Sequence, residues 1–407
     1  MARGSIIAGL DIGTHSIKAL VVQRKNKDWE VLSYAEIPSF GLRKGAVVKV
    51  EETAKNIQTI VAELEKECDR RIDAASVNIG GSHLYVTPSD GIISVSRADQ
   101  RISKEDVERV LQATRAINIP HNEEVLEVFP KEYIIDDQKG IRQPEGLTGV
   151  RLEAKVLLLC YFQPYFTNLT QAVLTSNVHI NDIMPSPLAA AKSVLTQQQM
   201  ELGVALIDFG AATTSLAVFE EGELLHLAIF PIGSGNITND IAIGLKTEVA
   251  IAEAVKKQHG TCLYSKGADK KDASVKKIEV FDKSSAINFT KKNLIDIIEP
   301  RVSEILDLVQ KELKKIGRQE LLPGGVVITG GGAKLSKIKE YTKESLKLAC
   351  EIGIPQGIIG LQEDPALATV AGLVLEGAEF ADKEQGIMGI SKGWKHWLRR
   401  WVRSFVP

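Results

Sequence analysis

The stretch SIIAGLDIGTHSIKALVV, residues 5–22, decides the fold that this sequence predicts. An apolar run leads into a turn built on Asp11 and Gly13, and a second apolar run begins at Ile17. Two apolar runs joined by a short polar turn are typical of a β-hairpin. We therefore expect a hairpin with a polar tip near the start of the chain.

The same pattern returns in VALIDFGAATTSLAVF, residues 204–219, where Asp208 and Gly210 take the places of Asp11 and Gly13. A pattern that recurs once, after about half the chain length, predicts two similarly built lobes. Ligand sites favour the cleft between such units. The repeat therefore predicts a binding cleft with one hairpin on each side.

A third glycine cluster lies in GGVVITGGGAKL, residues 324–335. A buried-strand run, then glycines, then a helical pattern is the order of a strand–turn–helix unit. Further helical patterns cover 51–68, 103–117, 185–196, 293–316 and 365–376, and those at 51 and 103 open with polar capping residues. This mixture indicates an α/β fold with two lobes.

The segment 83–163, between the two hairpins, reads as strands around the helix at 103. We interpret it as an inserted α+β subdomain of the first lobe. After Glu376 the sequence becomes polar and glycine-bearing, which is typical of a linker.

The composition excludes several classes of function. The 407 residues are 44% hydrophobic and 25% charged with a net charge of −2, so no basic field predicts nucleic-acid binding. Four widely spaced cysteines and the lack of a secretory signal favour a reducing cytosol. The longest apolar stretches, such as VLLLCYF at 156–162, are well short of the roughly 20 residues of a membrane span.

The polar hairpin tips suit phosphate chemistry. Glycines let backbone N–H groups approach anionic oxygens, and hydroxyls add further donors. An aspartate beside such a loop can hold Mg²⁺ through water, and Lys18 would supply a point charge for a phosphate. The alternative for either tip alone is a plain tight turn.

These stretches carry a family resemblance. DIGTHSIKAL, IDFGAATTS and ITGGGA resemble the two phosphate loops and the adenosine loop of the superfamily of actin, heat-shock chaperone ATPases and sugar kinases. Within it, residues 235–260, IIEPR at 297–301, PKEYIID at 130–136 and the basic aromatic tail are similar to the FtsA family of bacterial cell-division proteins. The resemblance covers essentially the whole chain.

The resemblance implies a two-lobed actin-like ATPase fold with ATP and Mg²⁺ in the interlobe cleft. It assigns residues to the first phosphate loop (Asp11, Gly13, Thr14, Lys18), the second (Asp208, Gly210, Thr213, Thr214) and the nucleoside contacts (Glu253, Lys256, Gly330, Gly331, Gly332). Asp11 and Asp208 would hold Mg²⁺ through water. Glu253 and Lys256 also stand one helical turn apart, where they could simply pair with each other.

The chain departs from the family pattern at the second loop. Ala211, Ala212 and Ser215 stand where the family commonly shows consecutive glycines and an aspartate. Two added Cβ atoms and one missing carboxylate favour binding over hydrolysis, so we expect at most a weak ATPase and name no catalytic base. Arg301 matches an arginine associated with FtsZ binding in the family, and an ordinary helix-surface arginine is the alternative.

The predicted domain division follows from the same comparison. It comprises a first-lobe core (1–82, 164–198, 364–380), an inserted subdomain (83–163), a second-lobe core (199–231, 323–363), a second-lobe outer subdomain (232–322), a linker (381–391) and a C-terminal amphipathic helix (392–407).

The last segment, GWKHWLRRWVRSFVP at 393–407, holds three of the four tryptophans. At helical spacing, one arc is apolar and the opposite side is basic, an arrangement suited to an anionic membrane surface. The residues expected to contact the membrane are Trp394, Trp397, Leu398, Arg399, Arg400, Trp401, Arg403 and Phe405. A helix packed on its own lobe or on a partner protein is the alternative.

The resemblance implies an ATP-binding division protein that polymerises and tethers FtsZ, a tubulin-like GTPase, to the membrane. It would bind the C-terminal peptide of FtsZ and attach to the membrane through its own C-terminal amphipathic helix. We expect it on the cytoplasmic face of the bacterial plasma membrane, at the division site. The rivals are a PilM-like pilus-assembly protein, for which no lipid-inserting tail is expected, and a small-molecule kinase of the same superfamily, for which we find no sugar-binding acid.

Overall fold

The computed structural model describes residues 6–26, 28–263, 278–281 and 286–384. The predicted amphipathic helix 392–407, with every residue expected to contact a membrane, lies outside these ranges. None of the helices in the described part of the chain combines the length and the apolar character that crossing a membrane requires.

The first hairpin stretch forms the centre of a five-stranded sheet. β1 (Ile6–Ile12) and β2 (Ser16–Lys25) pair antiparallel, which sets Asp11 opposite Lys18. β3 (Asp28–Pro38) extends the sheet beyond β2, and β6 (Ala74–Ile79) and β11 (His179–Pro185) add parallel strands beyond β1. The strand order is β11-β6-β1-β2-β3.

The second hairpin stretch builds a sheet of the same order. Its strands are β12 (Val204–Phe209), β13 (Thr214–Glu220), β14 (Glu223–Phe230), β17 (Val326–Thr329) and β18 (Cys350–Ile352). The order β14-β13-β12-β17-β18 again has an antiparallel hairpin at its centre and two parallel strands beyond it. The prediction of two similarly built lobes is therefore confirmed.

Helices cover both faces of the first sheet. Its helices are α1 (Val50–Cys68), α3 (Gln163–Thr175), α4 (Ser186–Val194) and α10 (Ala368–Glu384). Leu20 and Val22 of β2 pack in one core cluster with α10, whereas Ile17, Ala19 and Val21 pack in another with α1. Burial on both faces explains the continuous apolar run of the opening stretch.

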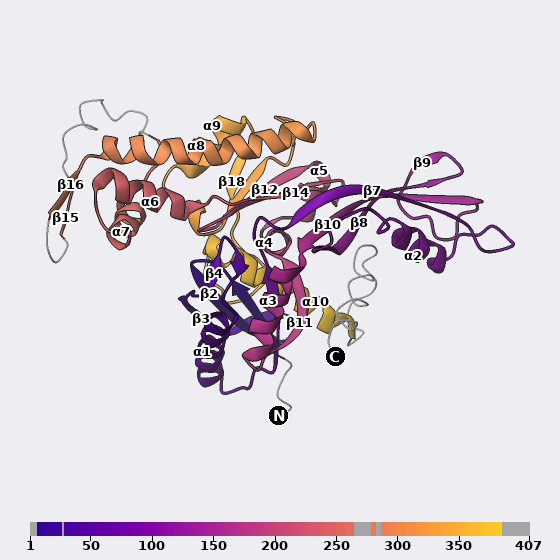
Figure 1. The fold of residues 1–407 in the computed structure, drawn as a ribbon, viewed down its shortest axis with the longest axis horizontal. Coiled ribbons are helices and arrows are strands. Elements are labelled where there is room, and N and C mark those ends of the chain that lie inside the picture. The colour runs from indigo at the N-terminus through magenta and orange to yellow at the C-terminus, as the bar shows by residue number, and fades with distance from the viewer. Residues whose placement is uncertain (1–5, 27, 264–277, 282–285, 385–407) are drawn as a thin grey trace.

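The second lobe carries its own helices, and the long α8 is prominent at the top of Figure 1. They are α5 (Gln197–Leu202), α6 (Ser234–Leu245), α7 (Val249–His259), α8 (Lys291–Lys315), α9 (Ile338–Leu346) and the 3-10 turn η2 (Gly331–Lys334). A second 3-10 turn, η3 (Pro365–Leu367), leads directly into α10, and Leu367 packs in the α10 core cluster. The two lobes also contain two short strand pairs: β4 (Leu42–Arg43) with β5 (Ala46–Val47), and β15 (Ile278–Phe281) with β16 (Ala286–Phe289).

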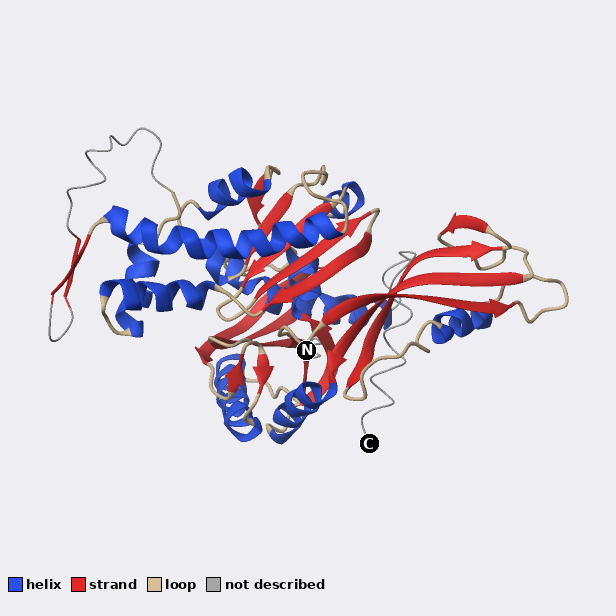
Figure 2. Cartoon of the chain, turned by 45° about the horizontal axis from the view of Figure 1, so that its top comes forward, coloured by secondary structure: helices blue, strands red, loops and turns tan. Residues whose placement is uncertain are grey.

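A separate α+β unit is inserted between β6 and α3, as predicted. It consists of β7 (Tyr85–Ser94), α2 (Lys104–Ala113), β8 (Glu123–Ile135), β9 (Gln138–Ile141) and β10 (Arg151–Phe162). The sheet order is β7-β10-β8-β9, and α2 packs on β7 and β10. Figure 2 shows this sheet projecting away from both lobes. The residue boundaries predicted for the lobes and their outer parts stay predictions.

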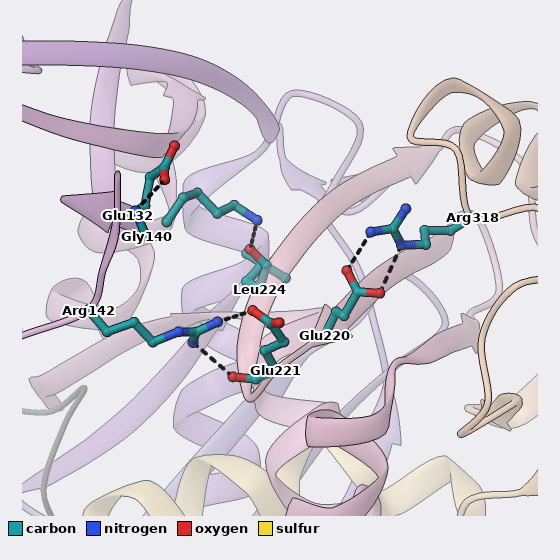
Figure 3. Close-up of polar contacts among 8 residues, drawn as sticks. Glu132, Gly140, Arg142, Glu220, Glu221, Leu224 and Arg318 are labelled. Atoms are coloured by element: carbon teal, nitrogen blue, oxygen red, sulfur yellow. Dashed lines mark hydrogen bonds and ion pairs between the residues drawn. The ribbon is translucent and has the colours of Figure 1, made fainter. Parts of the chain in front are cut away.

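The inserted subdomain also contacts the second lobe. Lys131 is the extra residue of a β-bulge in β8, because Glu132 pairs with Lys155 and Pro130 pairs with Val156. Its ammonium group donates to the carbonyl oxygen of Leu224 on β14. Nearby, Arg142 pairs with Glu221 in the turn between β13 and β14 (Figure 3). The subdomain therefore bridges the lobes.

The end of α10 differs from the prediction. The helix continues to Glu384, so residues 381–384 of the predicted linker are helical. The stretch AEFADKE after Gly377 contains good helix formers and no proline, and Ala381 packs partly buried against the α10 core cluster. Helix propensity and the packing of Ala381 together extend α10 beyond Glu376, where the apolar periodicity of the sequence ends.

Candidate functional site

The two hairpin tips face each other across a cleft of about 610 Å³. Thr14, His15 and Lys44 line it from the first lobe. The second-lobe lining is the tip at 211–212 together with residues of the starts of α6 and α7. A larger cavity of about 770 Å³ lies between the inserted subdomain and the second lobe, but it shares no lining residue with the hairpin tips.

Glycine is required at the same place in both tips. A Cβ on Gly13 would lie 2.9 Å from the carbonyl oxygen of Ser16, and one on Gly210 would lie 2.7 Å from the carbonyl oxygen of Thr213. Real Cβ atoms do not approach a backbone oxygen so closely. Both predicted loop glycines are therefore needed to close their turns.

Asp11 is buried and held by neighbours on two strands. Asn78 on β6 donates to its Oδ1 at 2.8 Å, and the Lys18 ammonium lies 3.7 Å from its Oδ2. Burial raises the pKa of Asp11 above its ordinary value, although Lys18 and Asn78 oppose the rise. The site thus holds a carboxylate whose charge is only partly compensated.

Asp208 occupies the equivalent position but lacks equivalent partners. Ser215 stands opposite it in the hairpin, where the first lobe has Lys18 opposite Asp11. Its carboxylate makes no hydrogen bond or ion pair with any residue of the described ranges. Burial and the charge of Asp11 together raise the pKa of Asp208 to about 6. Within the described ranges, Asp208 therefore has no ion-pair partner, whereas Asp11 has Lys18.

The triglycine loop closes against this second carboxylate. Gly330 has a φ of +83°, and a Cβ there would lie 2.1 Å from Oδ1 of Asp208. Gly332 packs on Phe209, whereas a Cβ on Gly331 would meet no atom within 4 Å. The structure thus places Gly330 directly beside Asp208. The assignment of these residues to a phosphate loop and to a nucleoside contact stays a prediction.

The threonines of the tips are used differently. The Thr14 hydroxyl accepts from the backbone N–H of Gly45 at 2.9 Å and lines the cleft. Thr214 is fully buried, and its hydroxyl donates to the carbonyl oxygen of Ile232 at 2.8 Å. Thr213 remains partly exposed at the tip. The Thr214 hydroxyl therefore stabilises the second hairpin tip from the side that faces away from the cleft.

Glu253 and Lys256 pair with each other on α7 at 2.7 Å. Thr238 on α6 donates to Glu253, and Lys256 donates to the carbonyl oxygen of Ser234. Burial alone would raise the pKa of Glu253, but the hydrogen bonds from Lys256 and Thr238 lower it below its ordinary value. Glu253 still lines the cleft, so pairing and ligand contact are compatible.

Metal binding would require ligands from outside the protein. Within the described ranges, no group of three or more His, Cys, Asp or Glu side chains is arranged to hold a metal ion. Mg²⁺ prefers hard oxygen ligands and keeps several waters. Two buried carboxylates without a full counter-charge, Asp11 and Asp208, fit an ion that is completed by water and phosphate oxygens.

Arg301 lies away from the cleft, on α8. Its guanidinium binds both oxygens of Asp240 on α6, at 2.7 and 3.0 Å. This bidentate pair raises the pKa of Arg301 further above its ordinary value. One helical turn after Asp240 on α6, Ile243 is an exposed apolar side chain, with 76% of its surface accessible.

Sequence reasoning missed Asn78 and Ser186. Asn78 Nδ2 donates to Asp11 and to the Ser186 hydroxyl, at 2.8 and 3.0 Å. A polar residue followed by Gly80 and Gly81 at the carboxyl end of a parallel strand was the available signal, because ligand sites form at that edge of such sheets.

The repeated sheets, the facing hairpins and the cleft between them define a protein of the two-lobed actin-like class. Two solved structures share this fold. The PilM–PilN type IV pilus biogenesis complex gives a TM-score of 0.66 at 19% identity, covering 91% of this chain and 98% of that chain. MreB5 of Spiroplasma citri bound to ADP gives 0.57 at 13% identity, covering 93% and 98%. Identities this low show the fold alone.

Sequence relatives give the family. A family model for the cell division protein FtsA matches residues 205–372, and one for the SHS2 domain inserted in FtsA matches residues 81–160. Cell division protein FtsA of Pseudomonas aeruginosa is 36% identical over 92% of this chain and 90% of its own length. The Bacillus subtilis FtsA is 33% identical over 97% and 88%. The chain belongs to the FtsA family of cell division proteins.

Proposed function

We propose that this chain binds ATP with Mg²⁺ in the cleft between the lobes. The observation that carries the proposal is the pair of buried carboxylates, Asp11 and Asp208, at the ends of equivalent strands. Their raised pKa values mean that burial leaves negative charge without a full counter-charge. A divalent cation would supply that counter-charge and, when bound, would neutralise phosphate oxygens.

The remaining cleft residues fit the same ligand. The hairpin glycines Gly13 and Gly210 allow the tight turns at the two tips. Backbone N–H groups of such turns can bind phosphate oxygens. Lys18 would add a positive charge beside the first tip. The solved MreB5 structure of the same fold is described as bound to ADP, which supports a nucleotide as the ligand.

We propose binding with slow hydrolysis. Ala211 and Ala212 line the cleft where glycines would leave more space. Ser215, opposite Asp208, provides no carboxylate that could accept a proton from water. The nucleotide would then act chiefly as a ligand that holds the two lobes together.

The proposed protein partner is the C-terminal peptide of FtsZ, bound beside Arg301. The exposed Ile243 side chain, one helical turn after Asp240 on α6, offers apolar contact area near the Arg301–Asp240 pair. A short peptide with apolar and acidic side chains would match this surface, because Arg301 already presents its guanidinium to carboxylates. Self-association into filaments would multiply these contacts.

The proposed location is the cytoplasmic face of the plasma membrane at the division site. The basic and tryptophan-rich sequence at 392–407 would bind anionic lipids as an amphipathic helix. A single short helix binds reversibly, whereas a filament carries many and holds them near the surface. Assembly would therefore convert weak tethers into stable attachment.

Nucleotide binding is tested by Asp208→Asn. The expected result is a loss of at least about tenfold in ATP affinity with Mg²⁺ and little change in EDTA, measured with a fluorescent ATP analogue. Asp182→Asn is the matched control, because burial also raises the pKa of Asp182 to about 6 but this residue lies on β11, the edge strand of the first sheet, and in neither hairpin tip. Equal affinities for both variants would refute the metal-bound nucleotide.

Membrane binding is tested by cosedimentation with anionic liposomes in the presence of ATP. The full chain is compared with a chain that ends at Met388. Loss of cosedimentation on truncation supports the tail as the anchor. Binding that persists, or that never occurs with the full chain, contradicts the tether and favours a role of the tryptophans in protein packing.

A further inference from the structure

The parallel pairing of β1 with β6 stops one residue before the candidate site. Gly9 pairs with Ser76 and Leu10 with Val77, so the next residues in register are Asp11 and Asn78. There the backbone ladder is replaced by a side chain: the N–H of Ile12 donates to Oδ1 of Asn78 at 2.7 Å. Asn78 therefore holds the strands together at the edge where the cleft opens.

This hydrogen bond fixes which way the Asn78 carboxamide points. Because Oδ1 accepts from a backbone N–H, the amino group must face the other way, toward Asp11. It donates to Oδ1 of Asp11 at 2.8 Å and to the hydroxyl of Ser186 at 3.0 Å. The Ser186 hydroxyl in turn donates to the carbonyl oxygen of Ile79 at 3.1 Å. No rotation of the Asn78 side chain preserves this set.

The second lobe has no amide in the position equivalent to Asn78. Thr329 pairs with Asp208 and so takes the place of Asn78. Its hydroxyl lies within hydrogen-bond distance of the carbonyl oxygens of Gly353 and Pro365, at 3.0 Å each, and makes no bond to Asp208. One carboxylate of the duplicated site is therefore fixed by an amide, and the other is held by none of the described side chains.

We propose that Asn78 is the positioning residue of the metal-bound nucleotide site. It holds Oδ1 of Asp11 in place, so that the carboxylate meets the hydrated Mg²⁺ of the nucleotide in a preset orientation. Asp208 adjusts to the ligand when it binds. The inference rests on the proposed function, since it assigns a role toward the same ligand.

The effect of Asn78 should be specific to the metal. Without the amide, the Asp11 carboxylate loses its fixed orientation, and ordering it again on binding weakens the complex. A hydrogen bond to a charged group is worth enough to change affinity by about tenfold, which is about 1.4 kcal/mol. Contacts of the nucleotide that do not involve the metal would keep their strength.

The test measures the affinity for a fluorescent ATP analogue over a range of Mg²⁺ concentrations and in EDTA. Two variants are used: Asn78→Ala, and Asn78→Thr, which installs the residue of the second lobe and suits a strand. Ser76→Ala is the matched control, because Ser76 is a buried polar residue on the same face of β6, two residues from Asn78. The expected result is a fall of about tenfold in affinity with Mg²⁺ for both Asn78 variants, no change in EDTA, and wild-type behaviour of Ser76→Ala.

Two results would overturn the positioning role alone. In one, the wild type responds to Mg²⁺ and the Asn78 variants respond equally. In the other, the variants lose affinity equally with Mg²⁺ and in EDTA, together with a lower melting temperature without nucleotide, which indicates a purely structural role. A wild type that binds no nucleotide overturns the proposed function itself and the positioning role with it.

Discussion

At the scale of single residues, the space around each glycine of the triglycine loop decides whether a larger residue can replace it. Gly330 has a left-handed φ of +83°, and a Cβ would lie 2.1 Å from Oδ1 of Asp208. Gly331, the next residue, has open space around its Cα. The two glycines are adjacent in sequence but unequal in structure, which allows a direct comparison.

Gly330→Ala should lower the free energy of unfolding by about 2 kcal/mol or more, because a left-handed alanine costs about 1–2 kcal/mol and the clash adds to it. Gly331→Ala should change it by less than about 1 kcal/mol. Urea unfolding followed by circular dichroism measures both. Equal losses would contradict the close approach of Gly330 to Asp208.

His83 lies at the entry to the inserted subdomain, with its ring 5.1 Å from that of Tyr165. Burial lowers the pKa of His83 to about 4, from an ordinary 6.5. Between these values the unfolded chain binds more protons than the folded chain. Stability therefore rises with pH through this window and is lost as the pH falls from about 6.5 to about 4.

His83→Phe keeps the aromatic contact and removes the titration. The wild type should lose about 2–3 kcal/mol more stability than this variant between pH 6.5 and pH 4. Melting temperatures of both proteins across that range measure the difference, with pH 8 as the reference. Parallel pH profiles would show that His83 does not titrate as its burial requires.

At the scale of secondary-structure elements, the sequence predicted helix starts correctly where neighbouring residues form the cap. The polar start of the helix at 103 is confirmed as a capping box, in which Ser103 and Asp106 each accept a backbone hydrogen bond from the other. The polar start at 51 is wrong as a cap: α1 begins at Val50, and Lys49 makes no side-chain capping bond. Only the helix at 103 has a hydroxyl at the N-cap, on Ser103, with an acid three residues later, Asp106.

Contacts between distant segments were beyond sequence reasoning. The hairpins could be predicted because their pairing is local, and this put Asp11 and Asp208 in equivalent places. The sequence could mark Asn78 as a candidate site residue but could not pair it with Asp11, since the two lie 67 residues apart and meet only through the parallel pairing of β1 with β6. The bulge at Lys131 likewise depends on the register between β8 and β10.

The α2 capping box also ties the helix to the strand beside it. Asp106 is fully buried, and its Oδ1 accepts from the N–H and hydroxyl of Ser96 at 3.2 and 2.8 Å. Burial alone would raise the pKa of Asp106, but the hydrogen bonds from Ser103 and Ser96 lower it. This carboxylate therefore joins the end of β7 to the start of α2.

Asp106→Ala should lower the free energy of unfolding by about 2–4 kcal/mol, because it removes the cap and leaves buried donors unsatisfied. Glu105→Ala, an exposed acid in the same helical turn, should cost less than about 0.5 kcal/mol. Urea unfolding monitored by amide exchange in α2 measures both. Similar losses in the two variants would show that Asp106 acts only through the charge of the first turn.

At the scale of the whole molecule, the inserted subdomain is covalently part of the first lobe yet contacts the second. Lys131 and Arg142 reach the β13–β14 turn, which the pair Arg318–Glu220 fixes from the other side at 2.7 and 2.9 Å (Figure 3). Any change in the angle between the lobes must then either move the subdomain or break these contacts. The subdomain is thus in a position to respond to a ligand in the cleft.

Arg142→Ala tests whether these contacts restrain the turn. The Arg142 and Glu221 side chains are largely exposed, so their pair should contribute no more than about 1 kcal/mol to unfolding. Amide exchange at 220–224 should nevertheless become several-fold faster, because local opening responds to one lost restraint. Arg151→Ala is the control, since Arg151 has similar exposure, 44% against 46%, but pairs within its own subdomain. Equal exchange in both variants would mean that the inserted subdomain and the second lobe move independently.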